Sequence, residues 1–182
     1  KYFAGCKEDH LGDWFSGIEN YPNGGVVRTF SRKKLEKIFD ACGVGERSFY
    51  YPYPDYKFMT TVYSDAYLPG RGELSNNLRN FDRDRMLLFD EKSAFDGIVE
   101  EGLFSVFSNS YLAVIGKPLD LKYVRYSNDR AESFRIRTEI LRDDRGNRIV
   151  RKYPLTKEAE AHVRHMMEAY EKLKGRYTGS RL

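Results

Sequence analysis

Apolar residues recur at helical spacing in three parts of the chain. Residues 30–43 repeat an apolar side chain at i, i+3, i+4 and i+7, with Ser31 placed to cap the helix and Gly43 placed to end it. A shorter helix is expected over residues 93–101, and a long one over residues 156–174. The residues before this first helix show no period of either kind and read as a long loop.

Strand-like patterns lie between these helices. Residues 48–53 and 57–63 are aromatic and β-rich, and the prolines between them predict a bend or a sheet edge. Residues 103–115 predict one long strand or two shorter ones, and residues 122–126 predict another. Further along, apolar and charged residues alternate over residues 134–140, which predicts a half-buried strand.

A polar turn at residues 144–147 makes residues 148–153 the hairpin partner of that strand. The long helix that follows needs an apolar surface to cover, because isolated helices of this length are marginal in water. We therefore expect helix and hairpin to pack as a unit distinct from residues 1–116. The side chains expected at that contact are Phe134, Ile136 and Ile140 of the hairpin and Ala159, Val163, Met166, Tyr170 and Leu173 of the helix.

These elements predict an α+β fold: a mixed or mostly antiparallel sheet with packed helices, followed by a β-hairpin and a long C-terminal helix. Charge indicates two modules. Residues 1–116 hold 14 basic and 17 acidic residues, whereas residues 117–182 hold 17 basic and 10 acidic residues, a net charge of +7. The change falls at Gly116-Lys117-Pro118, where the Gly/Pro pair is typical of a module boundary.

A basic module can meet an anionic partner such as a nucleotide phosphate, nucleic acid or a lipid headgroup. The interpretation we favour is a basic surface that packs against an acidic neighbouring domain, and we do not expect nucleic acid as a partner. No run approaches the roughly 18–20 apolar residues of a membrane span. Two cysteines without a paired motif indicate a reducing, cytoplasmic compartment. The aromatic start without a methionine suggests an internal piece of a longer protein.

Three polar clusters are candidates for chemistry. Glu8-Asp9-His10 places two carboxylates beside an imidazole, which suits catalytic proton transfer but also an ordinary polar loop. Residues 50–56, the Tyr–Pro segment, suit stacking on a sugar or a base, or a packed edge. Residues 108–110, the polar break, interrupt an apolar strand and imply a site or a β-bulge. The candidate substrate-binding residues are Tyr50, Tyr51, Tyr53, Asp55, Tyr56 and Asn109.

At these clusters the sequence resembles the C-terminal half of class I S-adenosylmethionine-dependent methyltransferase domains. The closest variety is the one joined to glycosyltransferases in bacterial cell-surface polysaccharide proteins. The resemblance covers about residues 1–116, and the order of elements fits the end of that fold. The segments that carry it are Lys1-Tyr2-Phe3-Ala4-Gly5, Glu8-Asp9-His10, Val27-Arg28-Thr29-Phe30-Ser31, residues 49–57 and Phe107-Ser108-Asn109-Ser110.

The resemblance implies a role on the substrate side. Methyltransferases of this class hold their cofactor with a glycine-rich strand–loop–helix in the N-terminal half, and this sequence has no such motif. S-adenosylmethionine is therefore expected in the longer parent protein and not on this chain, which should not methylate anything alone. In the parent, Glu8, Asp9, His10 and the Tyr–Pro segment would shape the acceptor pocket, with a carbohydrate acceptor and neighbouring domains as partners.

Residues after 117 resemble, more faintly, the start of a protein-kinase-like small lobe. The segment Ile149-Val150-Arg151-Lys152 lies on a predicted strand before a helix. In the kinase-like lobe, the lysine that binds nucleotide phosphates lies on a similar strand. A strand lysine is otherwise ordinary, and no glycine-rich loop precedes this one. Lys152 is the resulting candidate for nucleotide binding. We expect no metal site, since no third ligand supports His162 and His165.

Two functions follow from the sequence. The first is a fragment of a multidomain bacterial enzyme of methyltransferase type, acting in cell-surface polysaccharide or lipopolysaccharide biosynthesis and not catalytic alone. The alternative is a non-catalytic interaction or glycan-binding module that docks neighbouring domains. If the four tyrosines of the Tyr–Pro segment form a sugar platform, at least two rings should stay exposed beside Glu8 or His10.

Overall fold

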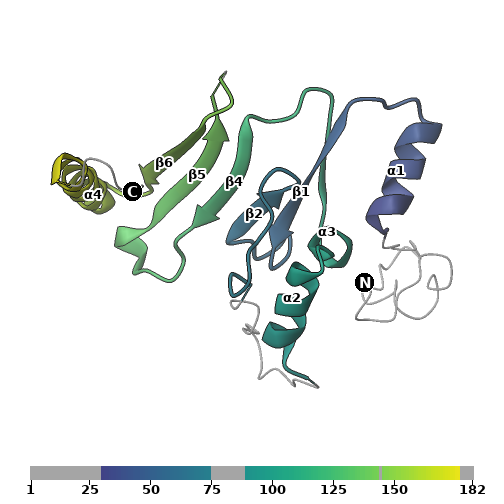
Figure 1. Ribbon diagram of the computed structural model, residues 1–182, viewed down its shortest axis with the longest axis horizontal. Helices are drawn as coiled ribbons and strands as arrows, with labels where there is room; N and C mark the ends of the chain where they lie inside the picture. Colours follow the sequence, from purple (N-terminus) through teal and green to yellow (C-terminus); the bar gives the residue numbers. More distant parts are fainter. Residues whose placement is uncertain (1–29, 75–88, 144, 177–182) are drawn as a thin grey trace, which may run out of the picture. The chain divides into compact units, whose positions relative to one another are not determined.

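The computed structural model describes residues 30–74, 89–143 and 145–176 (Figure 1). In this part of the chain, six strands form one sheet in the order β3-β1-β2-β4-β5-β6, and the recorded registers are antiparallel. Helices accompany the sheet, and the last described element is the long helix α4 (Lys157–Arg176). The predicted α+β fold is therefore confirmed. Among the described residues, no helix combines the length and apolar character that crossing a membrane requires.

The described residues form two compact units. Unit 1 runs to Met59 and resumes from Tyr63 to Pro118, and unit 2 comprises Thr60–Val62 and the residues from Leu119 onward. The short strand β2 (Thr61–Ser64) therefore contributes residues to both units. The sequence placed residues 60–62 in the first module, because nothing local shows that they pair with β4 (Leu121–Tyr126).

Unit 1 begins with helix α1 (Arg32–Ala41), as predicted. The Ser31 hydroxyl accepts the backbone N–H of Lys34 at 3.2 Å, and Gly43 adopts a φ of +71° just after the helix. That left-handed conformation suits glycine, which has no Cβ to clash. No residue of the helix is fully buried, so its apolar stripe only half-covers a neighbouring surface.

Strand β1 (Arg47–Tyr53) is buried from Phe49 to its end and pairs with β3 (Leu112–Ile115). The predicted strand over residues 57–63 begins later, at Thr61. The cause is a local turn in which the Asp55 carboxylate accepts the backbone N–H groups of Lys57 and Phe58 at 2.7 and 2.9 Å. Such side-chain bonds compete with strand pairing.

Helices α2 (Glu91–Glu100) and α3 (Phe104–Phe107) follow, and they contact one another. The prediction of a strand starting at Leu103 was wrong. Gly102, with a φ of +70°, ends α2, and the N–H of Leu103 bonds the Ile98 carbonyl at 2.8 Å. This closure turns the chain into a second helical turn and buries Phe104.

Unit 2 contains the predicted hairpin, formed by β5 (Ile136–Arg142) and β6 (Arg148–Pro154). The Asp143 carboxylate accepts the backbone N–H groups of Arg145 and Asn147, which fixes the turn. The strand was predicted to start at Phe134. Phe134 instead belongs to a short 3-10 helix, η2 (Glu132–Phe134), and is exposed.

The packing predicted for α4 is right for its first half only. The Thr156 hydroxyl caps the helix by accepting the Ala159 N–H at 3.2 Å, and α4 contacts β6 and η2. Ala159 is fully buried, whereas Tyr170 and Leu173 are 49% and 43% exposed. The helix has 20 residues and β6 only 7. The helix is therefore about 30 Å long and the strand about 23 Å, so the last turns of the helix extend beyond the hairpin.

Ala159→Leu should destabilise unit 2, because three extra carbons must enter a site that other residues already cover completely. We expect a loss of about 1–3 kcal/mol in the free energy of unfolding, measured by urea denaturation. Ala161→Leu on the exposed side of the same helix is the matched control. Equal effects of the two substitutions would show that the helix start is not packed as described.

Candidate functional site

The predicted site residues fall into three places. Glu8, Asp9 and His10 lie outside the described residues. Lys152 lies on β6 in unit 2, where it is exposed and sits opposite Thr138 of β5. The Tyr–Pro segment and the polar break lie in unit 1, and the structure brings them together.

Three of the four tyrosines are buried. Tyr50, Tyr51 and Tyr53 have almost no exposed surface, and only Tyr56 is open, at 66%. The expectation that at least two rings stay exposed is therefore wrong. The reason is the position of β1 between β3 and β2 in the sheet, where its rings pack edge to face against neighbouring aromatic rings. These contacts join Tyr51 to Phe104 and Tyr111, and Tyr53 to Tyr63.

Hydrogen bonds link the end of the Tyr–Pro segment to the polar break. The Asn109 side-chain amide donates to the Pro54 carbonyl at 3.1 Å, and the Ser110 hydroxyl accepts the Tyr56 N–H at 3.1 Å. The buried Ser108 hydroxyl donates to the Ser110 carbonyl at 2.9 Å. The polar break thus precedes β3 and fixes the turn after β1.

This junction carries an exposed rim, which consists of Asp55, Tyr56, Phe58, Met59 and Asn109. Tyr56, Phe58 and Met59 are exposed apolar side chains in nearly consecutive positions. The carboxylate of Asp55 and the exposed amide of Asn109 lie at the same turn. An aromatic face beside a carboxylate and an amide can stack on a sugar ring and bond its hydroxyl groups.

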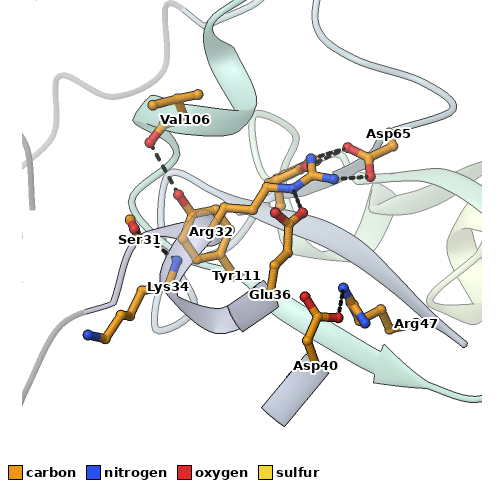
Figure 2. Close-up of polar contacts among 10 residues, drawn as sticks. Ser31, Arg32, Lys34, Glu36, Asp40, Arg47, Asp65, Val106 and Tyr111 are labelled. Carbon is orange, nitrogen blue, oxygen red and sulfur yellow. Dashed lines mark hydrogen bonds and ion pairs between the residues drawn. The ribbon is translucent and has the colours of Figure 1, made fainter. Parts of the chain in front are cut away.

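A second cluster surrounds the hydroxyl of Tyr51, a residue of β1, and was not predicted from the sequence. The guanidinium of Arg32 donates two parallel bonds to the Asp65 carboxylate, at 2.7 and 3.0 Å, and one to Glu36 at 3.0 Å (Figure 2). It also donates to the Tyr51 hydroxyl at 2.5 Å, and that hydroxyl donates to Asp65. We call Arg32, Glu36, Tyr51 and Asp65 the arginine cluster.

The arginine cluster shifts the protonation of two members. Burial raises the pKa of Tyr51 well above its ordinary value, and the hydrogen bond to anionic Asp65 adds to this. Burial alone would lower the pKa of Arg32, but its hydrogen bonds to Asp65 and Glu36 outweigh burial and raise it. Tyr51 therefore stays a neutral donor and Arg32 a cation, so the cluster holds fixed charges rather than a titrating catalytic group.

Sequence signals for this cluster were weak. Arg32 and Glu36 have the i, i+4 spacing of a helical ion pair, which by itself predicts only a contact on the surface of the helix. Asp65 is 33 positions from Arg32 in the sequence, and no local pattern connects the two residues. In the part of the chain that the structure describes, no group of three or more metal-ligating side chains comes together.

Asp65→Asn should destabilise unit 1 by about 1–2 kcal/mol, because the amide removes the negative charge that faces Arg32 and leaves one acceptor oxygen where Arg32 and Tyr51 had two. Urea denaturation measures the change. Asp40→Asn is the matched control, since Asp40 pairs with Arg47 at the same 2.7 Å but is more exposed. An exposed pair contributes at most about 1 kcal/mol. A larger effect at Asp40 would contradict the role given to the arginine cluster.

Tyr51→Phe should show a pH-dependent stability difference from the wild type. The folded protein keeps Tyr51 protonated, while the unfolded chain ionises it above a pH of about 10. Wild-type stability from this group is thus complete below that pH and is lost above it, by about 1.4 kcal/mol per pH unit. The advantage of wild type over Tyr51→Phe should stay constant up to a pH of about 10 and shrink above it. A pH-independent gap for Tyr51→Phe would contradict the raised pKa.

Comparison with known proteins identified no relative of this chain. No family model matches the sequence, and no curated protein or solved structure matches it either. The chain's own residues, and the resemblance of its sequence to methyltransferase domains, are therefore the basis for proposing a function.

Proposed function

We propose that this chain is part of a multidomain bacterial enzyme of methyltransferase type in cell-surface polysaccharide biosynthesis, to which it contributes elements of the acceptor side. The observation that supports this is the junction between Asn109 and Pro54. Residues 49–57 and 107–110, two segments on which the resemblance rests, are far apart in sequence and hydrogen-bonded to each other in the fold.

The described residues do not fit S-adenosylmethionine. The cofactor motif of this class needs a strand that enters a helix through a glycine-rich turn. The described connection of this kind, from β6 to α4, consists of Leu155 and Thr156 and contains no glycine. We therefore derive no step of methyl transfer through this chain, and its part in the reaction is to bind and orient the acceptor.

The exposed rim supplies the binding groups in this proposal. Tyr56 offers an exposed ring on a turn whose backbone is held by bonds to Asp55 and Ser110. A backbone that is already fixed loses little freedom on binding, which favours affinity. Glu8, Asp9 and His10 remain predicted parts of the same acceptor pocket.

A second candidate is a non-catalytic interaction or glycan-binding module. The observation in its favour is the set of exposed apolar residues Tyr56, Phe58 and Met59, which only Lys57 interrupts, because neighbouring exposed apolar residues often mark a surface that another molecule covers. Both candidates use the same rim, and they differ in whether the intact parent transfers a methyl group.

Tyr56→Ala in the intact parent protein should raise the KM for a carbohydrate acceptor by about tenfold, which corresponds to about 1.4 kcal/mol of lost binding. The kcat should change little, because the ring binds substrate without touching the reacting atoms. The assay follows transfer of a labelled methyl group from S-adenosylmethionine. Tyr170→Ala, an exposed tyrosine of α4, is the control and should leave both constants unchanged.

Isothermal titration of this chain with S-adenosylmethionine complements the assay. We expect no binding, since the cofactor-holding motif is absent. Tight binding would overturn the assignment of the chain to the acceptor side. If the intact parent protein transfers no methyl group but binds a glycan in a way that depends on Tyr56, the methyltransferase proposal is wrong and the glycan-binding module is right.

A further inference from the structure

Strand β6 forms one end of the sheet order and is exposed along almost its whole length. Val150 is 61% exposed and Ile149 40%, and Arg148, Arg151 and Lys152 are exposed as well. Only Tyr153 and Pro154, at the end next to α4, are half-buried. Helix α4 therefore leaves the middle of the strand uncovered. We call residues 148–152 the β6 edge.

The register shows which backbone groups of the β6 edge point outward. The N–H of Leu155 bonds the Arg135 carbonyl at 3.0 Å, and the N–H of Asp143 bonds the Asn147 carbonyl at 3.0 Å. Bonded pairs alternate along an antiparallel ladder, so Ile149 and Arg151 bond β5. The N–H and C=O groups of Val150 and Lys152 then face away from the sheet, where they can pair with another strand.

The side chains of the β6 edge give a defined charge pattern. Reading from Arg148 to Lys152, the order is basic, apolar, apolar, basic, basic. Lys152 and Arg125 lie on either side of Thr138 across the sheet, so their charges share one face without an acidic residue between them. On the other face Glu139 lies opposite Arg151, but its carboxylate is 2.9 Å from Arg137.

We propose that the β6 edge binds an acidic, extended polypeptide segment, which adds to the sheet as a further strand. The backbone of the segment bonds the outward groups of Val150 and Lys152. Its side chains follow the complementary order, with acidic residues opposite the basic ones and apolar residues opposite Ile149 and Val150. Main-chain bonds then give affinity and the charge order gives specificity.

Charge selects this occupant over a second copy of the chain. An antiparallel pair of two β6 strands centred on Val150 would set Arg148 of each copy opposite Lys152 of the other, and like charges directly opposite destabilise a strand pair. Nucleic acid fits less well, because a phosphate backbone offers acceptors but no donors to the outward carbonyl groups. This inference does not depend on the proposed function, because it concerns unit 2 alone.

The test uses a labelled peptide of sequence acetyl-Thr-Glu-Glu-Val-Val-Glu-Glu-Thr-amide, whose central pattern reads the same in both strand directions. Fluorescence anisotropy with the full chain should show saturable binding at low ionic strength. A peptide with lysine in place of each glutamate is the charge control and should bind at least about tenfold more weakly.

Val150→Pro is the decisive variant. It removes an outward N–H without removing a bond to β5, and should weaken peptide binding by about tenfold or more. Ile115→Pro is the matched control. Ile115 is also 61% exposed, and because the Gly116 N–H bonds the Glu46 carbonyl, the N–H of Ile115 points away from β1 at the opposite edge. Lys152→Glu provides a second test if the proline variant does not fold, and should shift preference towards the lysine peptide.

Amide hydrogen exchange distinguishes strand addition from adsorption to a basic surface. On peptide binding, exchange at Val150 and Lys152 should slow, whereas exchange at Ile115 should not change. Absence of binding, or binding that Val150→Pro and Lys152→Glu both leave intact, would overturn the proposal. So would a dimer of the chain that Val150→Pro dissociates, or a nucleic acid that displaces the peptide at the same amides.

Discussion

Burying the phenol of Tyr51 is the constraint on which unit 1 depends. A buried hydroxyl without a hydrogen-bond partner costs about 1–3 kcal/mol, so a fully buried tyrosine in the middle of β1 needs both a donor and an acceptor nearby. Arg32 supplies the donor and Asp65 the acceptor. Because Arg32 is the first residue of α1 and Asp65 directly follows β2, satisfying one hydroxyl ties three elements of the unit together.

The same burial explains why the exposed rim exists. Tyr50, Tyr51 and Tyr53 are buried in the core, and the chain leaves the sheet after them. The next aromatic residues, Tyr56 and Phe58, are therefore not covered by the neighbouring strands. The Asp55 turn and the bonds from Asn109 and Ser110 fix the point at which it leaves. Tyr56 and Phe58 are thereby presented at the surface on a turn whose backbone is held. One aromatic segment thus serves as a core strand at one end and as a candidate binding surface at the other.

Unit 2 has a smaller core than unit 1, and one of its strands is an exposed edge. Among the described residues of unit 2, Ile136, Val124 and Ala159 are the buried apolar ones, and the β6 edge is exposed. Natural proteins place charges, often lysine, on such edges because repulsion prevents identical strands from pairing. The basic residues of β6 therefore protect the edge against a second copy and at the same time favour an acidic strand. The positive net charge of residues 117–182 does not by itself identify a partner. The position of basic residues on an exposed edge strand does favour an acidic one.

Elements whose signals are local could be predicted from the amino-acid sequence. Helix α1 with its Ser31 cap, the hairpin of β5 and β6, and the Thr156 cap of α4 all follow from side chains within a few residues of each other. Local patterns also sufficed for the α+β class. They did not suffice after Gly102, where apolar residues over a few positions suit a strand and a helical turn equally, and the bond from Leu103 to Ile98 selected the turn.

Which polar and aromatic residues meet could not be predicted in this way, because it depends on the packing of distant segments. Four tyrosines in the Tyr–Pro segment are alike in sequence, yet three are buried and one is exposed, because burial depends on the strands that flank β1. The partnership of Arg32 with Asp65 and that of Asn109 with Pro54 each span more than 30 positions. No local pattern encodes such pairs. They form because the sheet places these segments side by side and a buried donor or acceptor must then find a partner within reach.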